Sequence, residues 1–364
     1  MHSPGAEYWI AFASVDGIGP TKTLRLNERF GSLHLAWTQS AEALHQAGID
    51  GPTARRFVQA RQKLDLHAEL ARLDRAGVEA ITWDDAERYP RLLRHIAYPP
   101  VVLYVRGELQ PRDELAVSLV GTRLPSAYGR QVAQKLAGEL AAKGVTIVSG
   151  LARGIDAEAH RAALAAGGRT LAVLGSGLDV MYPREHAGLA RDIARAGAVI
   201  SEYPLGTKPD AVHFPARNRI VSGLSLGAIV VEAGDTSGAL ITARMAGEQG
   251  RDVFAVPGSI FSKQSFGVHR LIQDGAKLVA GVQDVLDELN LGMVAHQLEM
   301  PVTPQPGDAG EVALLAALDG EPRHIDDIAR VAGLPMAQVS SLLTLMELKG
   351  LVRQAGALTY TAAI

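Results

Sequence analysis

The sequence ELAVSLVGTRLPSAYGRQVAQKLAGELAAKGVTIVSGLARGIDAEAHRAALAAGGRTLAVLG spans residues 114–175 and determines the fold class. It contains three short apolar runs, at 114–121, 145–150 and 169–175, with a stretch long enough for a helix after each of the first two. Apolar runs of this length are typical of strands buried on both faces of a sheet. Because strands joined through helices run parallel, the stretch predicts successive β-α-β units.

The same alternation continues toward the C-terminus. Further apolar runs separated by helical stretches lie at 198–203, 227–233, 252–258 and 276–280, and another short strand is expected at 79–85. Strands and helices in this order form a doubly wound sheet with helices on both faces. We therefore predict an α/β chain whose central domain, residues 78–290, is Rossmann-like.

The remainder of the chain divides into three parts. Residues 1–77 carry apolar side chains at helical spacing and predict a small helical domain. Its DGIGPT turn at 16–21 is that of a helix-hairpin-helix or, alternatively, of a plain helix–helix connection. The proline-rich stretch 291–309 predicts a linker, and residues 310–364 follow the element order of a winged helix.

The composition excludes several classes of protein. The chain has no cysteine, which rules out disulfides and thiolate metal sites, and no HExxH-type metal spacing. No run of about 18 apolar residues is present, so no membrane span is expected. Acidic Glu7 and Asp16 around a short apolar run do not resemble a signal peptide, so we predict a cytoplasmic location. With a net charge of −3, any affinity for nucleic acid must come from a local patch.

A local basic patch is present within residues 201–258. Lys208, Arg217 and Arg219 lie within a dozen residues of one another, and Phe214 lies among them. Cationic side chains with an aromatic ring are what single-stranded nucleic acid requires, because charge holds the backbone and a flat ring holds a base. Phe214 either stacks on a base or belongs to the core.

The two arginines of this patch are not expected to act together. Arg217 and Arg219 are two residues apart, so on a helix they point in different directions. Only one of them then shares a phosphate with Lys208, and the other forms an internal ion pair with Glu202 or Glu232.

Glycine turns at the predicted strand ends offer anion sites. Gly121, Thr122 and Arg123 follow one strand, and residues 149–154 follow the next. Such turns open onto helix N-termini, whose free N–H groups and dipole attract anions. In the segment 235–242, we predict that Ser237, Gly238 and Thr242 contact a phosphate, with a plain N-cap as the alternative for Ser237. No complete GxGxxG and no P-loop lysine is present, so no cofactor is expected.

Catalysis has weaker support in the sequence. Asp156 and His160 are four residues apart on a predicted helix and form a possible general-base pair, and Glu202 and Glu232 end strands. No serine or cysteine nucleophile accompanies them, so a non-enzymatic protein is predicted.

These motifs resemble those of the DNA-processing protein A family, also called Smf. The matching segments are YP at 89–90, PPVVLYVRG at 99–107, VGTR at 120–123, VSGLARGID at 148–156, AVLGSGLD at 172–179 and the whole stretch 201–258. The resemblance implies a homodimer that binds and protects single-stranded DNA during natural transformation and helps to load RecA recombinase. It also implies a sterile-alpha-motif-like N-terminal domain, a C-terminal winged helix, and single-stranded DNA-binding protein as a further partner.

The resemblance also implies functional residues. Arg123 corresponds to a DNA-contacting arginine, Gly206 and Lys208 to the GTKP-type loop, and Phe214, Arg217 and Arg219 to an FPxRNR element. The dimer surface corresponds to the last helix and strand of the central domain, around His269, Leu271 and Ile272.

Two observations limit other functions. From residue 306 onward, seven acidic and four basic residues give a net charge of −3, so we predict a protein-interaction or packing role for the winged helix rather than duplex reading. This also weakens the hypothesis of a transcription regulator. The alternative function is a Rossmann-like nucleotide-processing enzyme of the phosphoribohydrolase type, but residues 233–239 read AGDTSGA and lack the PGGxGT-type loop of such enzymes.

Overall fold

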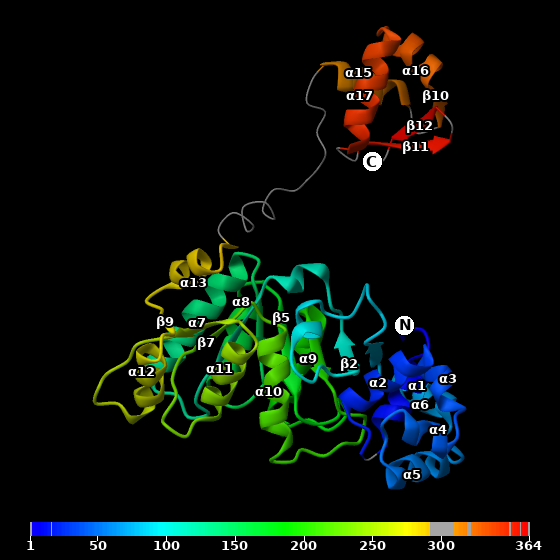
Figure 1. Cartoon of the computed structure of the whole chain (residues 1–364). Helices are drawn as coiled ribbons and strands as arrows, with labels where there is room; N and C mark the ends of the chain where they lie inside the picture. Colours follow the sequence, from blue (N-terminus) through cyan, green and yellow to red (C-terminus); the bar gives the residue numbers. More distant parts are fainter. Residues whose placement is uncertain are drawn as a thin grey trace. The chain divides into compact units, whose positions relative to one another are not determined.

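The computed structural model describes residues 2–15, 17–291, 309–318, 322–348, 351–356 and 358–362. Residues 1–295 form one compact unit and residues 296–364 a second (Figure 1). The predicted linker 291–309 lies outside the described residues except at its two ends.

Six short helices form the N-terminal part of the first unit. They are α1 (Ala6–Ala13), α2 (Pro20–Phe30), α3 (Leu33–Trp37), α4 (Ala41–Gln46), α5 (Gly51–Arg61) and α6 (Leu66–Arg75). Side-chain oxygens of Ser32, Ser40, Asp50 and Asp65 cap four of them, and Pro20 occupies the first position of α2, where a missing N–H costs nothing.

The core of these helices is aromatic and continues into the central sheet. The rings of Phe12 and Phe57 stack with centroids 4.4 Å apart, and Trp37 meets Phe57 edge-on at 5.3 Å. The same apolar cluster includes Tyr104 and Ala172 of the sheet. The N-terminal helices and the sheet therefore share one hydrophobic core and belong to one compact unit.

The central sheet has nine strands in the order β1-β2-β6-β5-β4-β3-β7-β8-β9 (Figure 1). The strands are β1 (Glu79–Thr82), β2 (Val102–Gly107), β3 (Ala116–Val120), β4 (Thr146–Ser149), β5 (Thr170–Leu174), β6 (Ala198–Ser201), β7 (Gly227–Val230), β8 (Asp252–Ala255) and β9 (Lys277–Leu278). In the part of the sheet that runs β6-β5-β4-β3-β7-β8-β9, neighbouring strands pair in parallel. At the other edge, β2 is antiparallel to β6 and β1 is antiparallel to β2. The predicted doubly wound parallel sheet is confirmed and carries an antiparallel extension at one edge.

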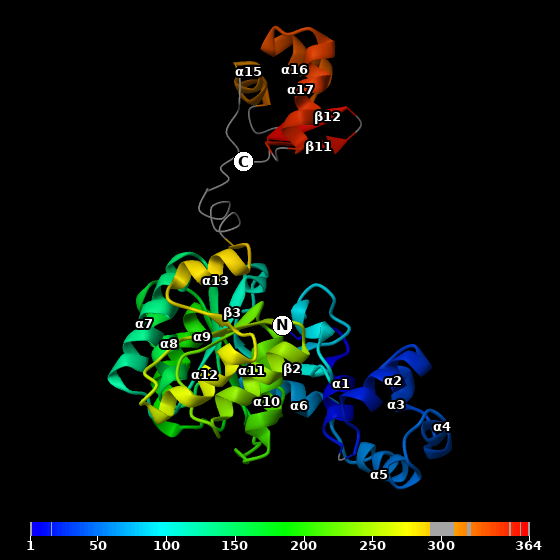
Figure 2. The ribbon, with the colours of Figure 1, turned by 60° about the vertical axis from the view of Figure 1, so that its left-hand side comes forward.

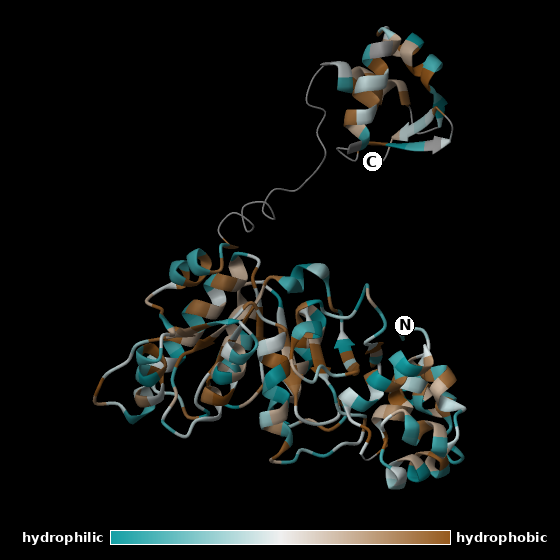
Figure 3. Cartoon of the chain, viewed as in Figure 1, coloured by the Kyte–Doolittle hydropathy of each residue, from teal (hydrophilic) through white to brown (hydrophobic). Residues whose placement is uncertain are grey.

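Helices cover both faces of this sheet (Figure 2). They are α7 (Ala127–Ala142), α8 (Ile155–Ala165), α9 (Ala187–Ala196), α10 (His213–Gly223), α11 (Gly238–Glu248), α12 (Phe266–Gln273) and α13 (Val282–Glu288), with short 3₁₀ turns at Leu92–His95, Pro111–Glu114, Arg184–His186 and Lys263–Ser265. Apolar side chains of α7, α8 and α13 pack in one cluster against the sheet, and those of α10, α11 and α12 pack in another. Figure 3 shows the apolar residues concentrated on the strands between these layers.

The strand order creates a crevice beside β3. The chain builds β3, β4, β5 and β6 toward one edge and then returns to place β7 on the other side of β3. At such a reversal the connecting loops diverge, and ligands collect beyond the carboxyl ends of the two strands.

The second unit has the winged-helix arrangement. Its elements are α15 (Ala309–Leu318), β10 (Arg323–His324), α16 (Ile325–Ala332), α17 (Met336–Leu348), β11 (Val352–Gly356) and β12 (Thr359–Ala362). Gly333 ends α16 at a positive φ of 66°, where a side chain would be strained, and the chain then turns into α17. Leu314, Ile328, Leu343 and Met346 fill the core.

Among the described residues, no helix combines the length and the apolar character needed to cross a bilayer.

Candidate functional site

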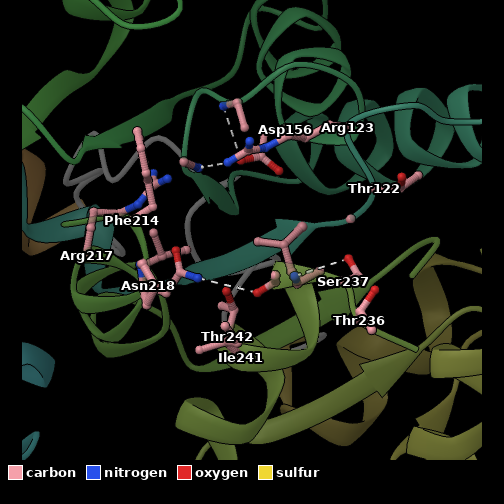
Figure 4. Close-up of a pocket in the computed structure, with 18 of the residues that line it drawn as sticks. Thr122, Arg123, Asp156, Phe214, Arg217, Asn218, Thr236, Ser237, Ile241 and Thr242 are labelled. Atoms are coloured by element: carbon pink, nitrogen blue, oxygen red, sulfur yellow. Dashed lines mark hydrogen bonds between the residues drawn. The ribbon is translucent and has the colours of Figure 1, made fainter. Parts of the chain in front are cut away.

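A cavity of about 980 Å³ lies at the reversal of the strand order, beyond the carboxyl ends of β3 and β7 (Figure 4). Eight of the predicted site residues line it: Gly121, Thr122, Arg123, Phe214, Arg217, Ser237, Gly238 and Thr242. Lys208, Gly206 and Arg219 do not line it, although Pro209 and Asp210, the residues after Lys208, do.

The loop after β3 forms one wall and is held close to β7. The Thr122 N–H donates to the Glu232 carbonyl over 2.7 Å. A Cβ at Gly121 would lie 2.6 Å from the Ile155 side chain, and one at Gly154, whose φ is 78°, would lie 2.4 Å from the Thr122 carbonyl oxygen. Both glycines are therefore required for the close approach of the turn after β3, which holds Gly121, to the turn after β4, which holds Gly154.

The carboxylate of Glu232 supports the same loop from behind. It is buried and accepts hydrogen bonds from the Ser126 backbone N–H at 2.9 Å and the Ser126 hydroxyl at 2.5 Å. A Cβ at Gly129 would lie 2.2 Å from its Oε2 atom. Glu232 thus sits at the N-terminus of α7, where the helix dipole favours a negative charge, and does not pair with either arginine of the basic patch.

Arg123 and Phe214 meet at the mouth of the cavity. Arg123 is exposed, and its guanidinium carbon lies 5.8 Å from the centre of the half-buried Phe214 ring. The ring also packs beside Tyr182, with centroids 5.4 Å apart, and against Gly175. Phe214 is therefore anchored by its neighbours while it still lines the cavity.

Arg217 reaches the cavity from inside the protein. It is only 5% exposed and donates from Nη1 to the Val173 carbonyl, and its buried Nε has no hydrogen-bond partner among the described residues. A Cβ at Gly150 would lie 2.1 Å from Nη1, so only glycine fits beneath the guanidinium. Burial lowers the pKa of Arg217 to about 10, and the nearby Asp156 carboxylate opposes that shift, so the side chain is cationic at neutral pH.

Asp156 lines the cavity beside Arg217. Its Oδ2 atom accepts hydrogen bonds from the backbone N–H groups of Gly150 at 3.1 Å and Ala152 at 3.3 Å. Burial raises the pKa of the Asp156 carboxyl, and Arg217 together with these N–H groups counteracts the increase. The arrangement fixes the loop after β4 and places a carboxyl group and a guanidinium in the buried part of the cavity wall.

The general-base pair of Asp156 and His160, a minor alternative in the sequence analysis, does not form. His160 is fully buried, and its Nδ1 atom lies 2.6 Å from the Thr170 hydroxyl oxygen. The Thr170 hydroxyl itself donates to the Ile147 carbonyl. Nδ1 must therefore carry the proton. Burial lowers the pKa of His160 to about 3, so the ring is neutral and structural, which argues against the catalytic alternative.

Arg219 belongs to an internal ion pair. Its two terminal nitrogens lie 2.7 Å and 2.6 Å from the two carboxylate oxygens of Glu202, and its Nε donates to the Tyr98 carbonyl at 3.0 Å. Hydrogen bonding and charge attraction from Glu202 raise the pKa of Arg219 against the effect of burial. The structure thus separates the two arginines: Arg217 lines the cavity, whereas Arg219 is saturated by Glu202 outside it.

The GTKP loop lies beside the cavity. Lys208 is exposed, and Gly206 adopts a φ of 83° while its N–H donates to Asp179 over 2.7 Å. Lys208 therefore lies in solvent, directly before the lining residues Pro209 and Asp210.

The N-terminus of α11 forms the opposite wall. The Ser237 hydroxyl oxygen accepts from the Ala239 N–H at 3.3 Å, so Ser237 is the N-cap, as the sequence alternative proposed. Gly238 is exposed beside it, and the Asn218 amide reaches the Gly238 carbonyl at 3.5 Å. Thr242 is buried one turn further along and also faces the cavity (Figure 4).

Sequence reasoning missed several lining residues. Lys263 and Gln264 come from the loop after β8, and Tyr182 and Asn218 complete the walls around Phe214. The strand-end rule that identified Arg123 also applies to the loop after β8 and would have identified Lys263. Within the described residues, the structure contains no group of three or more His, Cys, Asp or Glu side chains suited to a metal ion.

The predicted dimer residues lie on α12, away from the lining of this cavity. His269 Nε2 lies 3.0 Å from the Gly258 carbonyl oxygen, and Leu271 and Ile272 are half-buried.

A family model described as DNA recombination-mediator protein A matches residues 79–290, the part of the chain that holds the cavity. The chain belongs to this family. A model of the DprA winged helix domain matches residues 299–357, in agreement with the fold of the second unit. The resemblance inferred from the motifs is therefore confirmed.

Named relatives in this family cover most of the chain. It is 39% identical to protein Smf of Escherichia coli over 357 residues, which covers 94% of this chain and 92% of the relative. It is 36% identical to protein Smf of Synechocystis over 389 residues, covering 97% and 98%. Among solved structures, DNA processing protein A from Streptococcus pneumoniae superposes with a TM-score of 0.68 at 38% identity, covering 79% of this chain and 99% of that one.

A second solved relative carries a ligand description. The structure of DNA processing protein A from Helicobacter pylori, described for its single-stranded DNA binding mode, matches at 33% identity with a TM-score of 0.52. The match covers 56% of this chain and 94% of the Helicobacter chain.

Proposed function

We propose that this recombination-mediator protein binds single-stranded DNA in the cavity beyond β3 and β7 and performs no chemical step on it. The observation that carries the proposal is the meeting of Arg123, Arg217 and Lys263 with the half-buried ring of Phe214 in one open cavity. Cationic side chains around an aromatic face suit an unpaired strand. The Helicobacter relative, described with single-stranded DNA, supports the same ligand class.

Each wall of the cavity has a role in this proposal. The exposed guanidinium of Arg123 and the positive end of the α11 dipole, at the N-terminus of that helix, receive a phosphate. Lys208 receives a phosphate of the strand just outside the cavity. A base stacks on Phe214, and such stacking contributes about 1–3 kcal/mol per base. Arg217 and Asp156 form the buried end of the cavity, where polar edges of a base find a donor and an acceptor.

The geometry favours binding over catalysis. Of the carboxylates named as catalytic candidates, Glu232 holds the start of α7 and Glu202 is paired with Arg219. His160 is a buried neutral ring that bonds to Thr170. Each of these groups is committed to the fold, so we favour a non-enzymatic mediator over a nucleotide-processing enzyme.

The family resemblance supports a proposal for the wider cellular role. We infer a cytoplasmic protein that protects incoming single-stranded DNA during natural transformation and helps to load RecA recombinase. Single-stranded DNA-binding protein is a further partner in this role. A homodimer formed through His269, Leu271 and Ile272 on α12 would hold two stretches of strand, because each protomer contributes one cavity.

A salt titration tests the proposal. Affinity for fluorescent oligothymidylate is expected to fall with rising salt, with a log–log slope of about −2 if three phosphates are neutralised, because single strands give about −0.7 per phosphate. A duplex of equal length is expected to bind at least about tenfold more weakly, since its bases are stacked inside and cannot reach Phe214. Equal affinity for both, or a slope near zero, would refute single-strand binding in the cavity.

A further inference from the structure

An exposed apolar tip projects from the loop between β8 and α12. The tip contains Ile260, which is 71% exposed, and Phe261, which is 90% exposed. A nearly fully exposed phenylalanine leaves a large apolar face in water, so the position suggests a ligand that covers it.

The loop that carries this tip is held in place at both ends. The Tyr128 hydroxyl donates to the Pro257 carbonyl at 2.7 Å, and the Gln264 side chain donates to the Leu124 carbonyl at 2.7 Å. The Gln264 carbonyl in turn accepts from the Ala233 N–H at 2.8 Å. These contacts attach the loop to the turns after β3 and β7, so the loop that carries Phe261 is fixed at both ends.

The tip is continuous with the cavity. Lys263 and Gln264, two and three residues after Phe261, line the cavity wall. Leu124, whose carbonyl accepts the hydrogen bond from the Gln264 side chain, directly follows Arg123 and is 78% exposed. Leu124, Ile260 and Phe261 are here called the apolar rim. They lie one to three residues from Arg123 and Lys263, two exposed cations that line the cavity.

We propose that single-stranded DNA leaving the cavity crosses the apolar rim, where one further base stacks on Phe261 and Lys263 contacts the intervening phosphate. This inference rests on the proposed function, because it extends the path of the same strand. Phe261, Lys263 and the cavity follow one another in this order. A DNA strand fits this order better than a protein partner does, because each nucleotide brings one base for an aromatic ring and one phosphate for a cation. The alternative occupant, a second copy of this chain, is an outcome of the test.

The test uses the full-length chain with Phe261 replaced by alanine, leucine or tryptophan. Affinities for a length series of fluorescent oligothymidylates are measured by anisotropy, and the DNA-free proteins are compared by analytical ultracentrifugation. The side chain is exposed, so all three variants are expected to fold as the unmodified chain does, which thermal unfolding checks. The shortest bound oligonucleotides fill only the cavity, and the longer ones also reach the rim.

The length dependence identifies the occupant. Phe261→Ala is expected to weaken binding of the longer oligonucleotides about five- to hundredfold while leaving the shortest bound ones unchanged, the range expected for one stacked base. Phe261→Trp is expected to bind as the unmodified chain does, and Phe261→Leu to behave like alanine, because stacking requires a flat face.

Other results would overturn the inference. Unchanged affinity of Phe261→Ala at every length, or full binding by Phe261→Leu, would exclude stacking at the rim. A smaller sedimentation coefficient with unchanged affinity would assign the rim to a second copy of the chain. Absence of binding by the unmodified chain would instead refute the proposed function itself.

Discussion

Replacement of Arg123 by glutamate is expected to reduce affinity for oligothymidylate at least about a hundredfold and to leave thermal unfolding unchanged. The side chain is exposed at the mouth of the cavity, so the new carboxylate is tolerated by the fold. Near a phosphate, two unit charges about 4 Å apart interact by about 1–4 kcal/mol, and reversal both removes an attraction and adds a repulsion. A change of about 2.7 kcal/mol already corresponds to a hundredfold. Fluorescence anisotropy measures the affinity.

A matched charge reversal controls for the overall charge of the protein. Arg195 on α9 is also exposed, with 79% of its side chain accessible, and it does not line the cavity. Arg195→Glu is therefore expected to bind as the unmodified chain does, whereas Lys208→Glu is expected to weaken binding as Arg123→Glu does. If Arg123→Glu and Lys208→Glu both retain full affinity, the assignment of the site is wrong.

Replacement of Asp156 by alanine is expected to lower the free energy of unfolding by about 2–4 kcal/mol, because each buried N–H group left without its acceptor costs about 1–3 kcal/mol. Removal of the carboxyl group takes away the attraction that counteracts the effect of burial on the pKa of Arg217. It also leaves the Gly150 and Ala152 N–H groups without their acceptor. Urea unfolding followed by circular dichroism measures the difference.

Two further variants separate the causes. Asp156→Asn keeps an acceptor for the two N–H groups and removes only the charge, so it is expected to destabilise less than alanine. Asp192→Ala, which removes an exposed carboxylate paired with Arg195 on the surface, is expected to change stability by less than about 1 kcal/mol. A loss below about 1 kcal/mol in Asp156→Ala would show that Arg217 does not depend on this carboxylate.

The sheet was predictable from the sequence because its strands are local patterns. The apolar runs 114–121, 145–150 and 169–175 contain β3, β4 and β5, and each strand is shorter than its run by one or two residues at either end. The antiparallel pairing of β2 with β6 was not predictable, since it joins segments about 90 residues apart and has no local signature. The shared core of Phe12 and Tyr104 is likewise a long-range contact.

The candidate site was predictable in part for the same reason. The strand-end rule placed Gly121, Thr122 and Arg123 in the cavity because position along a strand fixes where its end lies. It could not show that Arg219 is saturated by Glu202 while Arg217 faces the cavity, because this depends on the orientation of α10.

A crystal structure of the chain with bound oligothymidylate tests the central claim most directly. We expect a phosphate between Arg123 and the N-terminus of α11, and a thymine ring against Phe214. An empty cavity, with the oligonucleotide bound elsewhere on the protein, would contradict the proposal.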